Sequence, residues 1–522
     1  MKRMTKMLSI AATTVVLASS LAACSSNNNG GNNSASSNET AATTDNSATN
    51  NNAAATDTSA TLPTLKRLDV FQGEDYATYP AGKLLEEKTG YKMTYDMLPQ
   101  DNPTQKLNLL MASGEPYDIV TTYNDMAMYS DYAKKGALTD LTPLIDQFGP
   151  NIKSAISQQS RDALKVDGKL YGIPNIITYP VGFGILIRTD WLDKVGMKMP
   201  ASTDEFQAVL QAFKDKNPGG HGSQDVPFTL KGDLPMIDDL VGAFGMPNPW
   251  NDVNGQLTPR LLDPSFPDYV KYVSGLYAGG LLDKGFVVNK DATAKEKFSS
   301  GKAGAIVVHW ADIPGISDAL TKAAPDAKFA FVPALKGPNG KSGFGANKGF
   351  DRLSFVPKSA KNPEDAIKWI NASLEPTTFK ELAIGVEGTH YTVDNGAYMP
   401  ILPIFNDERN LANDYMVGTD EANYPQYWQA RVHKDPVMFE AFDTLNNKTA
   451  DADKILNQLS VAPYLEAYSK NNQKLETMSG DYTVKLIAGA EKLDGLGDFQ
   501  KKFNAEGGEA SIKEVNAWYA SK

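Results

Sequence analysis

The stretch that decides the fold runs from Leu65 to Thr121 and reads LKRLDVFQGEDYATYPAGKLLEEKTGYKMTYDMLPQDNPTQKLNLLMASGEPYDIVT. Short apolar runs separated by helical periodicity predict strand, helix, strand, helix and strand at Leu65–Phe71, Ala77–Lys88, Tyr91–Met97, Pro103–Ala112 and Tyr117–Thr121. Strands that alternate with helices are typical of a parallel sheet covered on both faces. Such sheets bind ligands beyond the carboxyl ends of their strands. This stretch therefore predicts an α/β fold.

The same reasoning extends along the chain. Further helices are predicted at Asp125–Lys134, Pro143–Phe148, Met236–Phe244, Pro267–Ala278, Asp291–Ser299 and Pro363–Leu374. Another helix, ending at Lys216, is predicted to be capped by Thr203 with Phe206 in its third position. Further strands are predicted at Gly301–Val308 and Phe329–Leu335. The last hundred residues are predicted to be mostly helical, with the longest helical run at Lys454–Leu475.

Turn chemistry and glycines mark where the chain changes direction. Within Ala163–Pro174, the dipeptide Asp167-Gly168 suits the type I′ turn of a β-hairpin. The extended run Tyr179–Arg188 contains two glycines, and Lys341–Asp351 contains three. Glycine inside an extended run indicates a bend or a close approach of another segment. We therefore expect these two runs to cross between two lobes.

The N-terminus has the layout of an export signal. Basic residues precede a mildly apolar segment, Met7–Ala23, which ends at Leu21-Ala22-Ala23-Cys24. This is the pattern of a signal peptide over residues 1–23. A transmembrane helix is the alternative, but Thr and Ser residues interrupt a segment that would need about 20 predominantly apolar residues to span a bilayer.

Residues 25–61, here called the tether, contain no Leu, Ile, Val, Met or aromatic residue. Such a segment cannot bury enough apolar area to offset the entropy of ordering it. The sequence therefore predicts a flexible connection between Cys24 and a folded part that begins at Leu62.

Composition narrows the classes of function. Removal of residues 1–23 removes three basic residues, so 62 acidic residues face 48 basic ones and the formal charge moves from −11 to −14. An acidic surface argues against binding to nucleic acid, which depends on Lys and Arg at phosphates. Cys24 is the only cysteine, so the folded part has no disulfide and depends on a large core, with two or three domains expected from its length.

Several motifs resemble those of a known family. They are Asp167–Pro174, Ile187–Gly196 with its continuation Pro200–Phe206, Gly385–Tyr391 and Gly507–Tyr519. In this order they resemble the bacterial extracellular solute-binding proteins of ABC importers, in the maltodextrin-type family and its LipO-like lipoprotein group. Leu21–Cys24 likewise resembles the lipobox of bacterial lipoproteins, in which the cysteine carries a diacylglyceryl (palmitate-type) anchor and becomes the mature N-terminus.

The resemblance implies an α/β fold of the type II periplasmic-binding-protein class, with two lobes joined by two or three hinge segments and a helical C-terminal region. We expect the first lobe to comprise 62–183 plus about 348–400, and the second about 184–347 plus about 401–522. It also implies a monomer on the extracellular face of the cell membrane, held through Cys24. Such a protein is expected to close around a carbohydrate, specifically an oligosaccharide, and to deliver it to an ABC permease.

Relatives in this family often carry a calcium loop after the helix that ends here at Lys216. The corresponding stretch, Asn217–Asp225, reads NPGGHGSQD. Calcium prefers several carboxylate, amide or carbonyl oxygens at alternate positions, and this stretch supplies few. We expect the loop to be structural and expect no metal or other cofactor; a calcium ion held at this loop is the alternative.

A sugar site needs aromatic platforms and polar groups that bind hydroxyls. Candidates from strand ends, loops and the shared motif are Trp310, Tyr179, Trp250, Asp125, Glu387, His390 and Tyr391. Each has a structural alternative: Trp310 could fill a strand-to-helix corner, Asp125 could cap a helix, and the motif Gly385–Tyr391 could serve the fold alone.

Two other functions would suit an anchored, acidic protein. A surface carbohydrate-active enzyme would need two placed carboxylates or an activated nucleophile. The four histidines form no His-Glu-x-x-His pattern, and no Gly-x-Ser-x-Gly or Walker motif occurs, so we expect no enzyme. A sensor lipoprotein that presents its solute to a membrane kinase would keep the same cleft.

Overall fold

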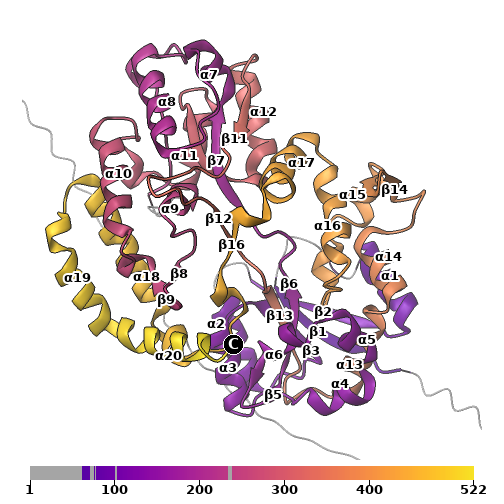
Figure 1. Cartoon of the computed structure of the whole chain (residues 1–522). Helices are drawn as coiled ribbons and strands as arrows, with labels where there is room; N and C mark the ends of the chain where they lie inside the picture. The colour runs from indigo at the N-terminus through magenta and orange to yellow at the C-terminus, as the bar shows by residue number, and fades with distance from the viewer. Residues whose placement is uncertain (1–61, 71–75, 77, 100–102, 233–237) are drawn as a thin grey trace, which may run out of the picture. The chain divides into compact units, whose positions relative to one another are not determined.

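The computed structural model describes residues 62–70, 76, 78–99, 103–232 and 238–522 (Figure 1). The predicted signal peptide, Cys24 and the tether lie outside the described residues. Thr61–Lys522 form one unit. Within its described part, no helix combines the length and apolar character that crossing a membrane requires.

The first sheet has five strands in the order β2-β1-β3-β13-β6. Their bounds are β1 Leu65–Val70, β2 Met93–Leu98, β3 Ile119–Tyr123, β6 Gly172–Ile176 and β13 Phe350–Phe355. β1 is parallel to both β2 and β3, as predicted, but β13 is antiparallel to β3 and to β6. The prediction of a wholly parallel sheet is therefore wrong. β13 enters from the carboxyl ends of β3 and β6, so it has to run in the opposite direction.

The helices that precede or follow the strands of this first sheet along the chain are α1 Pro80–Thr89, α2 Pro103–Ser113, α3 Met126–Lys134, α4 Thr142–Phe148, α5 Pro150–Ala155, α6 Gln158–Asp162, α13 Pro363–Ser373 and α14 Pro376–Ile384. α13 packs against α1, α4 and α5, and α14 packs against α1. β4 Lys165–Val166 and β5 Lys169–Leu170 form the predicted hairpin. Asp167 and Gly168 have φ of 50° and 78°, which confirms a turn with two left-handed residues.

The second sheet has three antiparallel strands in the order β10-β7-β11. They are β7 Phe183–Arg188, β10 Ala305–His309 and β11 Phe329–Phe331. The surrounding elements are α7 Thr189–Val195, α8 Thr203–Lys216, α9 Asp238–Ala243, β8 Trp250–Val253, β9 Gln256–Pro259, α10 Phe266–Ala278, α11 Asp291–Ser299 and α12 Ile313–Ala323. β10 and β11 are shorter than predicted at one end, and the start of the helix predicted from Met236 lies outside the described residues.

The start of α8 corrects the predicted cap. Ser202, not Thr203, is the N-cap: its side chain accepts a hydrogen bond from the backbone N–H of Glu205 at 3.2 Å. Glu205 therefore occupies the third helical position in place of Phe206, and its carboxylate accepts a hydrogen bond from the backbone N–H of Ala201 at 2.8 Å. The reciprocal bonds resemble a capping box, which explains why the helix starts one residue earlier than its expected cap allows.

The C-terminal region is mostly helical, as predicted, with one exception. Its elements are β14 Tyr391–Asp394, β15 Ala397–Pro400, α15 Ile404–Glu408, α16 Tyr424–His433, α17 Pro436–Asp443, β16 Lys454–Leu456, α18 Glu466–Ala488, α19 Leu496–Phe503 and α20 Glu509–Tyr519. The predicted helix Lys454–Leu475 is wrong over its first half. Pro463 interrupts that half, and Lys454–Leu456 pairs with another strand instead.

Two segments connect the sheets, as the glycine-bearing runs predict. Residues 177–182 join β6 to β7, and β12 Phe344–Ala346 leads through 347–349 into β13. The two segments bind each other: Ile177 N–H donates to Gly349 O at 2.8 Å, and Asn347 N–H donates to Pro180 O at 3.0 Å. β12 also pairs in parallel with β16, which brings a third segment alongside.

Gly349 shows why glycine is needed where these segments meet. Its φ is +103°, and a Cβ atom there would lie 2.2 Å from Ser460 O. Buried apolar residues group around each sheet, and those between Phe405 and Ala430 belong to the group around the first sheet. The lobe boundaries given above remain a prediction.

Candidate functional site

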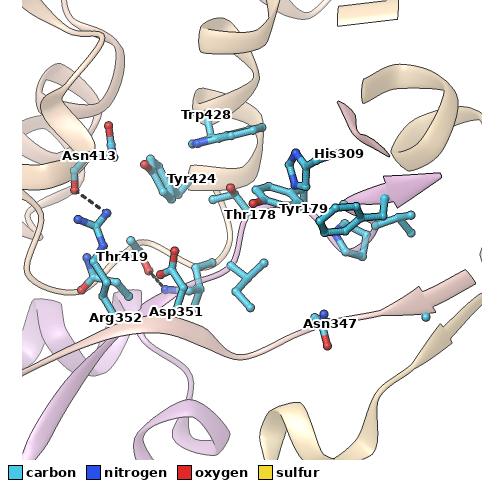
Figure 2. Close-up of a pocket in the computed structure, with 18 of the residues that line it drawn as sticks. Thr178, Tyr179, His309, Asn347, Asp351, Arg352, Asn413, Thr419, Tyr424 and Trp428 are labelled. Atoms are coloured by element: carbon cyan, nitrogen blue, oxygen red, sulfur yellow. Dashed lines mark hydrogen bonds between the residues drawn. The ribbon is translucent and has the colours of Figure 1, made fainter. Parts of the chain in front are cut away.

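A cavity of about 320 Å³ lies where the connecting segments leave the sheets (Figure 2). Its wall combines the first connection, the start of β13, the end of β10 and one face of α16. The lining residues include Thr178, Tyr179, Gly182, His309, Asn347, Asp351, Arg352, Asn413, Thr419, Tyr424 and Trp428. Its volume is at the lower end of the ~300–1,000 Å³ typical of small-molecule sites.

Aromatic side chains form one wall of the cavity. Tyr424 and Trp428 lie four residues apart on α16 and therefore on the same helix face, and Tyr179 comes from the first connection. The rings of Tyr179 and Trp428 are 5.4 Å apart with an interplanar angle of 36°. Trp310 supports both: its ring contacts Tyr179 edge-on at 5.2 Å and Trp428 edge-on at 5.6 Å. The wall is thus a packed cluster rather than a set of mobile rings.

His309 contributes a defined hydrogen-bonding group to this wall. It ends β10 and caps the following turn, with its Nδ1 accepting a hydrogen bond from Ala311 N–H at 3.1 Å. Burial lowers the pKa of the imidazole, so the ring is neutral at pH 7. Because Nδ1 is an acceptor, the neutral ring carries its proton on Nε2. His309 can therefore donate a hydrogen bond from Nε2.

The opposite side of the cavity is polar. Arg352 forms an ion pair with Asp414 at 3.0 Å and donates to Asn413 O at 3.3 Å. Asp351 has a solvent-accessible side chain in the cavity, where the surrounding protein raises the pKa of its carboxyl by desolvation, partly offset by Arg352. Figure 2 places Asp351 below Tyr424 and Trp428 in that view, with its carboxyl directed toward them.

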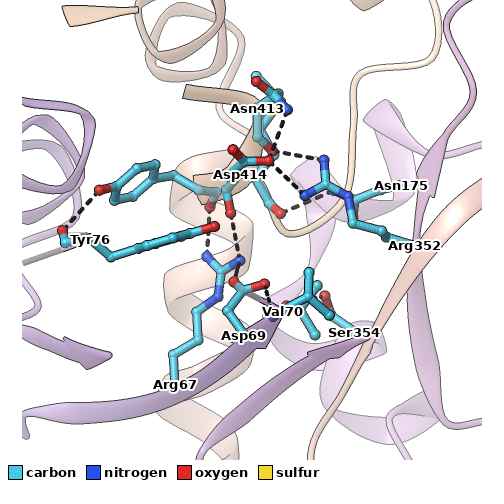
Figure 3. A network of polar contacts seen from close by, with 12 residues as sticks. Arg67, Asp69, Val70, Tyr76, Asn175, Arg352, Ser354, Asn413 and Asp414 are labelled. Atoms are coloured by element: carbon cyan, nitrogen blue, oxygen red, sulfur yellow. Dashed lines mark hydrogen bonds and ion pairs between the residues drawn. The ribbon is translucent and has the colours of Figure 1, made fainter. Parts of the chain in front are cut away.

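A network of charged side chains lies next to Arg352, on the polar side of the cavity (Figure 3). Arg67 on β1 pairs with Asp69 and donates to the backbone oxygens of Tyr415 and Asp414 at 2.8 and 3.0 Å. Asp414 in turn accepts from Arg352 and from the side chain of Asn413. Arg67 and Asp69 are fully buried, and the network ties the end of β1 to the segment that carries Asn413.

The structure brings only part of the predicted site together. Tyr179 lines the cavity, whereas Trp310 is buried behind it, in the corner that was the structural alternative. Trp250 is buried and lines a different cavity of about 260 Å³. Asp125 is the N-cap of α3, where it accepts from Met128 N–H at 3.0 Å.

The Gly385–Tyr391 motif also lies outside the cavity lining. His390 accepts a hydrogen bond from Val386 N–H at 3.0 Å and pairs with Glu408 at 3.0 Å. Tyr391 is buried and contacts Tyr398 edge-on at 5.3 Å, while Glu387 is exposed. These contacts account for the motif as a structural feature, and its role in binding stays a prediction.

Sequence reasoning did not single out Trp428, Tyr424, His309 or Asp351. The Tyr424–Trp428 pair has the four-residue spacing of a helix face, and Asp351 ends the second glycine-bearing run. Both signals are visible, but neither says which helix face meets which connection. That information depends on tertiary contacts.

The loop Asn217–Asp225 is held by its own hydrogen bonds. The Asp225 carboxylate bonds to the His221 ring at 2.8 Å and accepts from His221 N–H at 3.3 Å. Within the described residues there is no cluster of three or more His, Cys, Asp or Glu side chains arranged to hold a metal ion. The expectation that no cofactor is required stays a prediction.

Two sheets joined by crossing segments, with an aromatic and polar cavity at the junction, define a ligand-binding protein. A family model described as bacterial extracellular solute-binding protein matches residues 81–392, and the chain belongs to this family. The resemblance found in the motifs is thereby confirmed.

Curated relatives agree with this assignment. An uncharacterised protein in the butB 5′ region of Niallia circulans is 39% identical over 252 residues, which cover 48% of this chain and 98% of that protein. Lipoprotein LipO of Bacillus subtilis (strain 168) is 28% identical over 463 residues, 85% of this chain and 89% of LipO. The polygalacturonan/rhamnogalacturonan-binding protein YtcQ of the same organism is 25% identical over 455 residues, with 83% and 86% covered.

Solved structures share the fold. The alginate-binding protein AlgQ2 without calcium ion has a TM-score of 0.65 and 21% identity, covering 88% of this chain and 98% of that chain. The substrate-binding protein FusA of Streptococcus pneumoniae in complex with kestose has a TM-score of 0.65 and 20% identity, covering 88% and 99%. The predicted fold class, a type II solute-binding fold, is confirmed.

Proposed function

We propose that this extracellular solute-binding protein captures an oligosaccharide in the cavity at the sheet junction and delivers it unchanged to an ABC permease. The observation that carries the proposal is the Tyr179–Trp428 ring pair facing the Asp351 carboxyl. Sugar rings present apolar faces to aromatic side chains, and their hydroxyls donate to carboxylates and accept from N–H groups. Relatives named for polygalacturonan and fructooligosaccharide binding support the choice of carbohydrate.

The cavity is poorly equipped for glycoside hydrolysis. That reaction commonly uses two carboxyl groups that flank the scissile bond. Among the described residues that line the cavity, Asp351 is the only carboxylic acid. A binding role therefore fits the residues better than the enzyme alternative does.

The N-terminal residues support a second part of the proposal, which concerns location. We propose that Cys24 carries a lipid anchor and that the tether holds a monomeric binding domain at the outer face of the cell membrane. The lipoprotein relative LipO supports this proposal. Replacement of Cys24 with Ser is expected to move the protein from the membrane fraction to the medium, whereas unchanged membrane association would contradict the anchor.

Calorimetric titration with a panel of oligosaccharides tests binding. Replacement of Trp428 with Ala is expected to weaken binding of the best ligand at least tenfold, because this half-buried ring lines the cavity and Trp is among the residues that commonly dominate binding energy. Trp518→Ala provides a matched control, since this tryptophan lies on α20 outside the cavity lining. Circular dichroism checks that both variants are folded.

Chromatography of the ligand after prolonged incubation separates the receptor from an enzyme. Recovery of intact oligosaccharide in a 1:1 complex supports the proposal. Shortened products, or an equal loss of affinity in both tryptophan variants, would overturn it.

A further inference from the structure

The cavity carries a distinct charge pattern. Among its described lining residues, only Asp351 and Arg352 are charged at neutral pH, since His309 is neutral. The named relatives leave the charge of the ligand open, because polygalacturonan is a polymer of carboxylated sugars and fructooligosaccharide is neutral. Sequence similarity therefore does not decide whether this chain binds neutral or carboxylated sugars. The charged residues that line the cavity are the remaining guide.

The guanidinium group of Arg352 is already occupied. One of its terminal nitrogens pairs with Asp414 at 3.0 Å and the other donates to Asn413 O at 3.3 Å, and its side chain is 11% exposed. Recognition of a carboxylate by arginine commonly uses two parallel N–H···O bonds from the same fork. With the fork directed at Asp414 and Asn413, Arg352 cannot offer that geometry to a ligand.

The opposite charges within the neighbouring ion pairs cancel. Arg352 and Asp414 neutralise each other, as do Arg67 and Asp69 below them. Asp351, whose charge Arg352 only partly offsets, is left as the net negative charge that is accessible in the cavity. A carboxylate brought against it would meet like charge in a partly desolvated space, where repulsion is stronger than in water.

We infer that the cavity selects neutral oligosaccharides and rejects those built from uronic acids, with Asp351 as the residue that determines this selectivity. This inference rests on the proposed function. Asp351 has two effects: its carboxylate accepts charge-assisted hydrogen bonds from neutral sugar hydroxyls, and its charge repels a sugar carboxylate. The aromatic wall of Tyr179 and Trp428 binds sugar rings of either kind, so it does not contribute to the discrimination.

Matched ligands isolate the effect of charge. Oligogalacturonate of defined length, and the same oligomer after chemical reduction of its carboxyl groups, differ only in the carboxylates. Both are titrated calorimetrically into the full-length protein, alongside neutral gluco-, manno-, xylo- and fructo-oligosaccharides. The best neutral ligand is expected to bind at least tenfold more tightly than oligogalacturonate. The reduced oligomer is likewise expected to bind at least tenfold more tightly than its carboxylated parent.

Two variants test the role of Asp351. Asp351→Asn keeps the shape of the side chain and removes its charge. It is expected to weaken binding of the best neutral ligand several-fold and to reduce the preference for the reduced oligomer over its parent to less than threefold. Asp394→Asn is the control, because it removes one negative charge from an exposed position on β14 outside the cavity lining. It is expected to leave both quantities unchanged.

The outcomes separate this inference from the proposed function. Tighter binding of oligogalacturonate than of every neutral glycan would overturn the inference and leave oligosaccharide capture standing. Equal preferences in the wild type and Asp351→Asn would overturn the role of Asp351. Binding of neither series would overturn the proposed function, and the inference with it.

Discussion

The buried carboxyl of Asp69 makes the stability of the fold depend on pH. Asp69 and Arg67 are both fully buried, so the attraction between them competes with the cost of removing a carboxylate from water. Burial is the larger effect and raises the pKa of Asp69 from 3.8 to about 6, against the opposing influence of Arg67 and Arg352.

The sign of the dependence follows from proton binding. Between pH 3.8 and about 6, Asp69 is protonated in the folded state and ionised in the unfolded chain. The folded state therefore binds more protons in this window, so the free energy of unfolding decreases as pH rises and levels off above it. The shift from 3.8 to about 6 corresponds, at about 1.36 kcal/mol per pKa unit, to a loss of about 3 kcal/mol.

Urea denaturation of the wild type and Asp69→Asn at half-unit intervals from pH 4 to pH 8 measures this effect. Burial lowers the pKa values of His309 and His433, which gives stability the opposite slope below their unfolded pKa of 6.5. That contribution is common to both proteins and cancels in their difference. Loss of the Arg67–Asp69 ion pair in the variant changes the free energy of unfolding by an amount that does not vary with pH, because a guanidinium does not titrate in this range.

Most of this loss falls within the measured range, so the difference in the free energy of unfolding, wild type minus variant, is expected to fall by about 2.5 kcal/mol between pH 4 and pH 8. A difference that stays flat, or that increases with pH, would refute the reasoning. It would mean that the ion pair with Arg67 outweighs the desolvation of Asp69.

Three further predictions follow from local geometry. Ser202→Ala is expected to lower the free energy of unfolding by about 1 kcal/mol through loss of the α8 cap, and an unchanged value in urea denaturation would contradict the corrected cap. Gly182→Ala would place a Cβ atom 2.9 Å from His309 Nε2, so we expect a loss of about 1–3 kcal/mol of stability together with weaker ligand binding by calorimetry. Gly315→Ala on α12 meets no atom within 4 Å and is the control, expected to be neutral or stabilising by up to about 1 kcal/mol. Treatment with EDTA is expected to leave the melting temperature and ligand affinity unchanged, because Asp225 in the loop Asn217–Asp225 already bonds to His221; a marked drop that added calcium restores would show that the loop holds the ion.

Local patterns in the sequence were enough to predict several elements. The turn at Asp167-Gly168, the helix at Asp291–Ser299 and the glycine-bearing connections agree with the structure. Each depends on residues close together in the chain: left-handed backbone at Asp167 and Gly168, helical spacing of apolar residues, or a glycine where another segment approaches. The error at Lys454–Leu475 has the opposite cause, because Lys454–Leu456 forms a strand only through pairing with Phe344–Ala346.

The sequence by itself determined the alternation of strands and helices, the positions of the connecting runs and the family. These features depend on the spacing of apolar residues, on turn residues and on short motifs, all of which are local in the chain. Only the tertiary structure decided the direction of β13, the meeting of Tyr179 with Trp428 and the pairing of Arg352 with Asp414. These depend on contacts between segments that are far apart in the chain. The composition of the cavity wall, and hence the charge that a ligand meets there, is settled by how those segments pack against one another.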